Sequence, residues 1–169
     1  MGGVGVELQT LIERYSGSRE DRGKAVFSTI FIVGNKLQTL FDARIPKLTL
    51  RQFMLLSIAG QAASPLTLTE LGEVLGCSRQ NVRKLAGALE AKGFAELRRS
   101  EEDARAVTLM PTEKAKAYFA EVFPEYASEL GALFSVYDDA EEKALFELMM
   151  RLYAGLEKLA EAGEGGKNA

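Results

Sequence analysis

The sequence of 169 residues contains no histidine and a single cysteine, Cys77. Without histidine the chain cannot form a Ser-His-Asp triad, a histidine acid–base pair or most transition-metal sites. One cysteine cannot close a disulfide within the chain or supply a zinc site of the cysteine type. The sequence also has no phosphate-binding glycine loop, so it indicates neither an enzyme nor a bound metal or cofactor.

Long apolar runs are absent as well. The longest, at 26–33 and 145–150, fall far short of the ~20 residues that cross a bilayer. The first six residues match neither a secretory signal nor a myristoylation motif. Apolar residues make up 47% and charged residues 27% of the chain, as in globular proteins. We therefore expect a cytoplasmic protein with one domain, residues 1–169.

Charge is unevenly distributed, although the net charge is only −3. Residues 1–60 carry eight Lys or Arg against five Asp or Glu, residues 61–112 carry seven of each, and residues 113–169 carry six against twelve. Six cations and two anions fall within 78–99. Such a basic stretch can bind a polyanion even in an acidic protein, and a solvated helix face is the alternative.

The first part of the chain predicts one long helix. We expect residues 1–23 to be weakly structured, apart from a short helix over 6–15. Apolar side chains then recur at helical spacing over 24–44. Pro46 cannot extend a helix and biases Ile45 toward extended backbone, so the helix is expected to end there.

Three helices are predicted next. The segments 49–62 and 67–76 both begin with Thr-x-x-Gln or Thr-x-x-Glu, the pattern of a capping box. Gly76 suits the left-handed end of the second helix. Ser78 is a typical N-cap, and it opens a third helix over 78–92.

The apolar period then changes from helical to alternating. Residues 94–99 and 106–110 have the pattern of strands, and the polar turn between them predicts an antiparallel hairpin. Helical periodicity returns over 112–137, with a kink expected at Pro124. A last helix is expected over 138–162, before a frayed polar tail.

This order of elements predicts a winged helix-turn-helix over 49–110, in a mostly α fold with a short β-hairpin. The second helix of this motif buries one apolar stripe. The outward face of that helix carries no acidic residue in the first half of the helix. Arg can bind guanine, Gln and Asn can bind adenine, and a major groove accepts such a helix. The outward residues are Arg79, Gln80, Asn81, Arg83 and Lys84.

The segment 66–82 resembles the helix-turn-helix of MarR-type bacterial regulators. Residues 85–94 are similar to the exit of that family's recognition helix into its wing, and 103–109 look like the wing itself. The resemblance covers about 24–160 and is most specific over 66–112. It implies a homodimeric, ligand-responsive repressor that binds double-stranded DNA, with each wing in a minor groove.

The apolar stripes of the outer helices also favour a homodimer. Helices 24–44 and 112–162 carry apolar residues that the small winged region does not cover, and a two-fold axis would cover them. Such an axis would place two recognition helices about one turn of DNA apart. The outer helices are therefore predicted to form the dimer.

The resemblance adds contacts outside the recognition helix. It places Arg105 of the wing in a minor groove, and an ion pair with Asp103 is the alternative. Side chains alternate across a strand, so only one of Arg98 and Arg99 is expected to face phosphate. The complete set of predicted DNA contacts is Ser78, Arg79, Gln80, Asn81, Arg83, Lys84, Arg98, Arg99 and Arg105. The turn departs from the family, because 100–103 is acidic and Ala104 replaces the usual Arg or Lys.

The family's ligand pockets lie between the dimer helices and the winged region, which suggests a small apolar or aromatic effector. The candidate residues, which suit an ordinary core equally well, are Phe27, Phe31, Asn35, Phe53 and Met54. Two alternatives stay open. The module could bind protein without DNA, or Cys77 could sense oxidants rather than fill the turn as a small apolar side chain.

Overall fold

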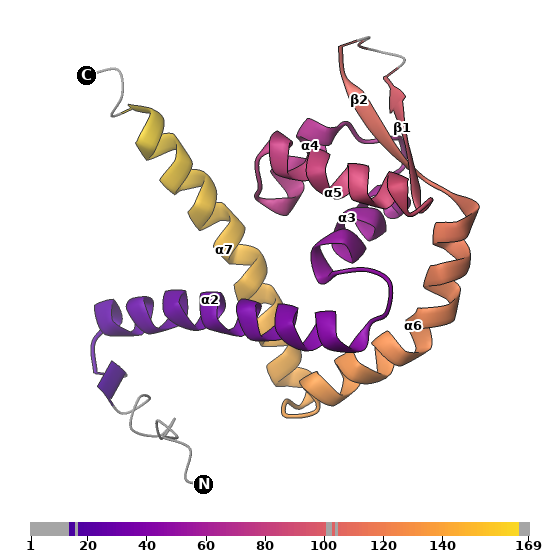
Figure 1. Cartoon of the computed structure of the whole chain (residues 1–169). Helices are drawn as coiled ribbons and strands as arrows, with labels where there is room; N and C mark the ends of the chain where they lie inside the picture. The colour runs from indigo at the N-terminus through magenta and orange to yellow at the C-terminus, as the bar shows by residue number, and fades with distance from the viewer. Residues whose placement is uncertain (1–13, 16, 101–102, 104, 166–169) are drawn as a thin grey trace, which may run out of the picture. The chain divides into compact units, whose positions relative to one another are not determined.

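The computed structural model describes residues 14, 15, 17–100, 103 and 105–165. Its elements are α2 (Arg19–Arg44), α3 (Leu50–Gln61), α4 (Leu68–Leu75), α5 (Arg79–Ala91), β1 (Ala95–Arg99), β2 (Val107–Pro111), α6 (Glu113–Phe134) and α7 (Asp139–Gly165) (Figure 1). The predicted mostly α fold with a short hairpin is confirmed. Most of the predicted helix over 6–15 lies outside the described residues, as do Glu101, Glu102 and Ala104 of the predicted turn.

The chain divides into two compact units, Met1–Phe119 and Ala120–Ala169. The first unit contains α2 to α5, both strands and the beginning of α6. The second contains the rest of α6 and all of α7. None of the helices in the described part of the chain is long and apolar enough to span a membrane.

Helix α2 begins at Arg19 rather than at the predicted Lys24. Ser18 caps it, because the Ser18 Oγ accepts the Asp21 N–H at 3.0 Å. The acids Glu20 and Asp21 in the first turn also suit the positive end of the helix dipole. The expectation of weak structure was therefore wrong for residues 19–23.

The last two helices also differ from the prediction at their ends. Helix α6 ends at Phe134 rather than near 137, and α7 continues to Gly165 rather than ending near 162. Asp138 and Glu141 explain where the connection lies. The Asp138 Oδ1 accepts the Glu141 N–H at 2.9 Å, and the Glu141 Oε2 accepts the Asp138 N–H at 3.0 Å. This reciprocal cap starts α7, so α6 has to end before Asp138. Beyond 162 the chain contains no proline, and the helix continues.

The predicted capping boxes of α3 and α4 are confirmed. In α3, the Thr49 Oγ1 accepts the Gln52 N–H at 3.3 Å, and the Gln52 Oε1 accepts the Thr49 N–H at 3.2 Å. In α4, Thr67 and Glu70 exchange the same bonds at 3.2 and 2.7 Å. Gly76 ends α4 with φ of 63°, in the left-handed region that glycine adopts without strain.

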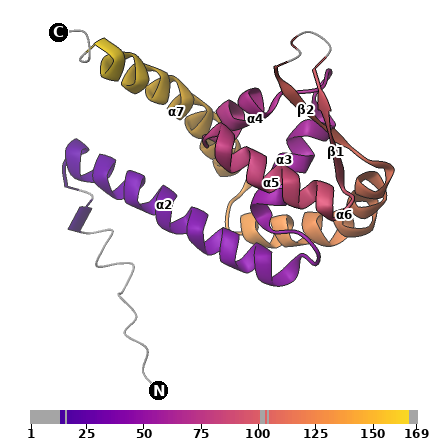
Figure 2. The same cartoon turned by 45° about the horizontal axis from the view of Figure 1, so that its top comes forward.

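Strands β1 and β2 pair antiparallel, from Ala95 opposite Pro111 to Arg99 opposite Val107. The segment before α4 extends this pairing, because Thr67 bridges to Thr108. Figures 1 and 2 show the hairpin projecting beyond the cluster of α3, α4 and α5. The hairpin is therefore held, through Thr108, against the segment that precedes α4.

The core of the first unit lies between α3, α4, α5 and β2. Its largest fully buried side chains are Leu55, Leu56, Leu68, Leu71, Val82, Leu89 and Leu109. Helix α5 contributes one stripe to this core, in which Val82, Ala86 and Leu89 have no exposed surface. Burial of that stripe fixes which face of α5 remains outside.

Candidate nucleic-acid interface

A short turn between α4 and α5 sets the position of α5. After Gly76, the Cys77 N–H donates to the Gly72 carbonyl at 2.9 Å. A Cβ on Gly72 would lie 2.7 Å from the Cys77 carbonyl oxygen, so only glycine lets the turn lie so close to α4. The Ser78 Oγ then accepts the Asn81 N–H at 3.3 Å and caps α5, as the sequence predicted. The Cys77 side chain is half-buried. This burial lies between that of a small apolar side chain filling the turn and that of an exposed thiol that senses oxidants.

The outer face of α5 is basic and polar. Arg79, Gln80, Arg83 and Lys84 are exposed, while Asn81 is half-buried beside the cap. The first ten residues of α5 contain no acid, and the N-terminal end of a helix carries a partial positive charge. This face can therefore attract an anionic surface and offer hydrogen-bond donors to it.

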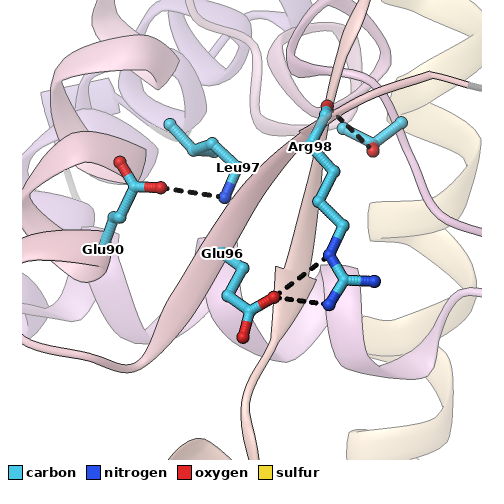
Figure 3. A network of polar contacts seen from close by, with 5 residues as sticks. Glu90, Glu96, Leu97 and Arg98 are labelled. Atoms are coloured by element: carbon cyan, nitrogen blue, oxygen red, sulfur yellow. Dashed lines mark hydrogen bonds and ion pairs between the residues drawn. The ribbon is translucent and has the colours of Figure 1, made fainter.

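The two arginines of β1 have different surroundings (Figure 3). The Glu96 carboxylate accepts from the Arg98 Nε at 3.0 Å and from its Nη2 at 2.5 Å, and both side chains are exposed. Arg99 is also exposed. Because Glu96 balances the charge of Arg98, Arg99 is the better placed of the two for an anion.

Glu90 links α5 to the hairpin (Figure 3). Its Oε1 accepts the Leu97 N–H of β1 at 3.1 Å. On the other strand, the Thr108 hydroxyl donates to the Arg98 carbonyl at 3.3 Å. In the sequence, Glu90 is only one of two anions in a basic stretch, and its spacing from Leu97 does not predict this contact. Its signal was an acid in the last turn of a helix that leads directly into a strand.

Arg105 lies exposed at the end of the hairpin turn. Its backbone N–H, rather than its guanidinium, donates to the Asp103 Oδ1, at 2.8 Å. The Asp103 N–H in turn lies 3.4 Å from the Ser100 Oγ. Asp103 therefore organises the turn through the backbone, and the exposed Arg105 side chain extends from a held backbone.

The structure separates the five predicted effector residues. Phe53 is buried, and its ring packs between those of Phe41 and Phe119, each with a centroid 5.0 Å away. The other four, all exposed, are Phe27, Phe31, Asn35 and Met54. Among the described residues, a single chain does not bring these five side chains into one enclosed site.

The turn, the basic outer helix face and the hairpin together define a winged helix-turn-helix protein. A family model described as the MarR family matches residues 47–106. The matched residues contain α3, α4, α5 and β1, so this part of the chain is similar to the MarR family. The transcriptional repressor MprA of Escherichia coli (strain K12) is 30% identical over 109 residues, which cover 64% of this chain and 62% of MprA.

Solved structures share the fold. A MarR/EmrR family transcriptional regulator from Acinetobacter sp. ADP1 has a TM-score of 0.70 and 18% identity, and the match covers 80% of this chain and 97% of that one. PcaV of Streptomyces coelicolor, a transcriptional regulator solved in complex with its natural ligand, has a TM-score of 0.65 and 15% identity. That match covers 91% of this chain and 98% of PcaV.

Proposed function

We propose that this protein is a transcription regulator that binds a specific sequence in double-stranded DNA, in the cytoplasm where bacterial DNA lies. The outer face of α5 carries this proposal. Arg79, Gln80, Arg83 and Lys84 are exposed on a helix whose opposite stripe is fully buried. Because MprA is a repressor by name, repression is the proposed direction of control.

Residues along the proposed interface differ in what they contact. Arg79, Gln80 and Asn81 lie nearest the start of α5 and contact base edges in the major groove. Lys84 lies one turn later and binds phosphate. The other proposed contacts are Ser78 at the N-cap of α5, Arg83 beside Lys84, the strand residues Arg98 and Arg99, and Arg105 of the wing in the minor groove.

The outer helices, over 24–44 and 112–162, are proposed to form a homodimer. In the single chain α2 has no buried residue, and Phe27 and Phe31 are 78% and 69% exposed. Apolar patches of this kind mark interaction sites. A two-fold dimer would cover them and place two winged regions, 49–110 of each chain, on a palindromic operator.

A small apolar or aromatic effector is proposed to bind at this dimer. Phe27, Phe31, Asn35 and Met54 are exposed in the single chain, so a second chain would have to complete their site. PcaV, with its natural ligand bound, is a structural precedent in the same fold for a regulator that takes a ligand.

Binding to DNA from upstream of the protein's own gene tests the proposal. We expect affinity for this DNA to exceed that for a shuffled sequence of the same composition, and to fall steeply as salt rises. A Lys143→Ala variant, which removes a cation from α7, is the matched control and should bind like the parent. A winged-helix module that only contacts proteins would show no preference between the two DNAs.

A further inference from the structure

The connection between α2 and α3 contains a strained turn. Lys47 has φ of 71°, and among the described residues it is the one non-glycine residue with a positive φ. The Leu48 N–H donates to the Pro46 carbonyl at 2.9 Å, across Lys47. A positive φ inside this three-residue hydrogen bond defines the rare, strained form of the γ-turn. Such backbone persists only where the surrounding structure holds it.

Two side chains from other elements hold this γ-turn. The Tyr118 hydroxyl of α6 donates to the Pro46 carbonyl at 2.6 Å. The Lys92 Nζ, at the C-cap of α5, donates to the Lys47 carbonyl at 2.7 Å. The Pro46 carbonyl thus accepts a side-chain donor from α6, and the Lys47 carbonyl accepts one from the C-cap of α5.

Lys92 is committed to these internal contacts. Its Nζ also donates to the Gln52 Oε1 at 3.1 Å, and Gln52 is one of the buried polar residues of the first unit. An ammonium has three donors, and two of them are used here. The Lys92 carbonyl itself accepts the Lys114 Nζ at 2.6 Å. Lys92 is therefore placed to join elements rather than to contact phosphate.

We propose that Lys92 and Tyr118 form a latch on the γ-turn at Lys47, and that the latch positions α5 for DNA recognition. It ties the turn after α2 to the C-cap of α5 and to the start of α6, all within Met1–Phe119. Release of the latch lets the strained turn relax and changes how α5 is held relative to α2. This inference rests on the proposed function, because positioning matters where α5 meets DNA.

Three substitutions separate the latch from other roles. Lys92→Met removes the ammonium and keeps an apolar stem, and Tyr118→Phe removes only the hydroxyl. Lys47→Gly removes the strain, because glycine adopts a positive φ freely. It also removes the Lys47 ammonium, whose Nζ lies 5.6 Å from the centroid of the Tyr118 ring. Lys47→Ala is the matched control, since it removes the same ammonium and keeps the strain.

DNA affinity is measured for the full-length variants at a temperature where circular dichroism shows each to be folded. We expect Lys92→Met and Tyr118→Phe to weaken specific binding roughly fivefold or more, the size of one lost hydrogen bond. Adding Lys47→Gly should restore most of that affinity, and adding Lys47→Ala should not. Unchanged affinity in both latch variants would show a role in stability only. If Lys92→Met weakens binding to specific and random DNA equally, and Lys47→Gly does not restore the affinity, Lys92 contacts phosphate and the latch is refuted.

Amide hydrogen exchange at Leu48 measures the latch without DNA. Exchange should be faster in Lys92→Met and in Tyr118→Phe than in the parent, because the γ-turn bond opens more often. Unchanged exchange in both would overturn the latch, whatever the DNA result. A parent that fails to discriminate between the two DNAs would instead refute the proposed function, and with it the role of the latch in recognition.

Discussion

The cations at the proposed interface differ in their partners, and the partners determine what each can contribute. The Arg98 guanidinium donates two hydrogen bonds to the Glu96 carboxylate, at 3.0 and 2.5 Å. Arg105 has its backbone held by Asp103 while its side chain is exposed. Lys84 lies exposed on α5. Counting charges in the sequence therefore overstates the part that Arg98 can play.

Replacing Glu96 by Gln should strengthen DNA binding. The change removes a negative charge beside the proposed phosphate contacts and releases Arg98 from its pair, so one more cation faces the DNA. We expect a steeper dependence of log K on log salt, by about one unit. In the parent, Arg98→Ala should cost less affinity than Arg99→Ala. Equal losses, with no gain from Glu96→Gln, would show that the pair breaks on DNA.

The sequence predicted the position of a residue where that position depends on the periodicity of a single helix or strand. The outward positions of α5 followed from its helical period and from its buried stripe. The partners Glu90 and Lys92 were missed because each contact depends on a second element, and Glu96 was missed although its contact lies within a single strand. Glu96 and Arg98 meet only because β1 is a strand with positions i and i+2 on one face. The bond from Lys92 to the Lys47 carbonyl spans 45 positions in the sequence.

At the scale of elements, local capping chemistry explains why most boundaries could be predicted. Thr49, Thr67 and Ser78 each cap a helix as expected. The start of α2 was missed, although Ser18 and Asp21 have the same spacing as the boxes that were recognised. Gly23 and the surrounding polar residues concealed it, because no apolar periodicity marks that first turn.

Two glycines inside helices should respond oppositely to alanine. In α4, a Cβ on Gly72 would lie 2.7 Å from the Cys77 carbonyl oxygen, so Gly72→Ala should destabilise the fold by about 1–3 kcal/mol. In α5, a Cβ on Gly87 would meet no atom within 4 Å, so Gly87→Ala should stabilise it by about 0.4–1 kcal/mol. Denaturant unfolding of both variants measures this, and a stabilised Gly72→Ala would contradict the account of the turn.

The capping box of α4 should make stability depend on pH. Hydrogen bonds from the backbone and the side chain of Thr67 lower the pKa of Glu70 below its usual value. A lowered folded-state pKa contributes stability above the unfolded pKa, about 4.3, and this contribution is lost as pH falls through the folded pKa.

The Glu70→Gln variant isolates this effect, since its amide oxygen can still accept the Thr67 N–H but does not titrate. We expect the parent to have the higher Tm at pH 6, and the difference to shrink as pH falls below about 4.3. The remaining acids titrate in both proteins, so they cancel in the comparison. A difference in Tm that stays constant from pH 6 to pH 3 would show that the carboxylate adds nothing beyond its hydrogen bonds.

At the scale of the whole molecule, the single chain leaves apolar helix faces uncovered. On α7, Leu156 and Leu159 are 55% and 72% exposed, and α2 has no buried residue. The sequence predicted these stripes from helical spacing and predicted that the winged region leaves them uncovered, but it could not show how exposed each residue is. It also did not separate Phe53, which lies in the core, from Phe27 and Phe31, because all three are apolar residues of predicted helices and helical spacing does not show which residues are buried.

Sedimentation at micromolar concentration should show a particle of twice the 18.4 kDa chain mass. Phe27→Glu places a charge on the exposed face of α2 and should shift the protein toward monomer, since burying an unpaired carboxylate opposes association. Lys36→Glu changes an exposed polar position of the same helix and is the matched control. A monomeric parent would remove both the dimer and the inference of a palindromic operator.

Whether α5 reads base sequence is tested most directly by comparing Gln80→Ala with Lys84→Ala on specific and random DNA at two salt concentrations. The account predicts that Gln80→Ala costs about 1–3 kcal/mol on the specific DNA and little on random DNA. Lys84→Ala should weaken both about equally and lower the salt slope by about one unit. If Gln80→Ala weakens both DNAs alike, or neither, α5 is not the recognition helix.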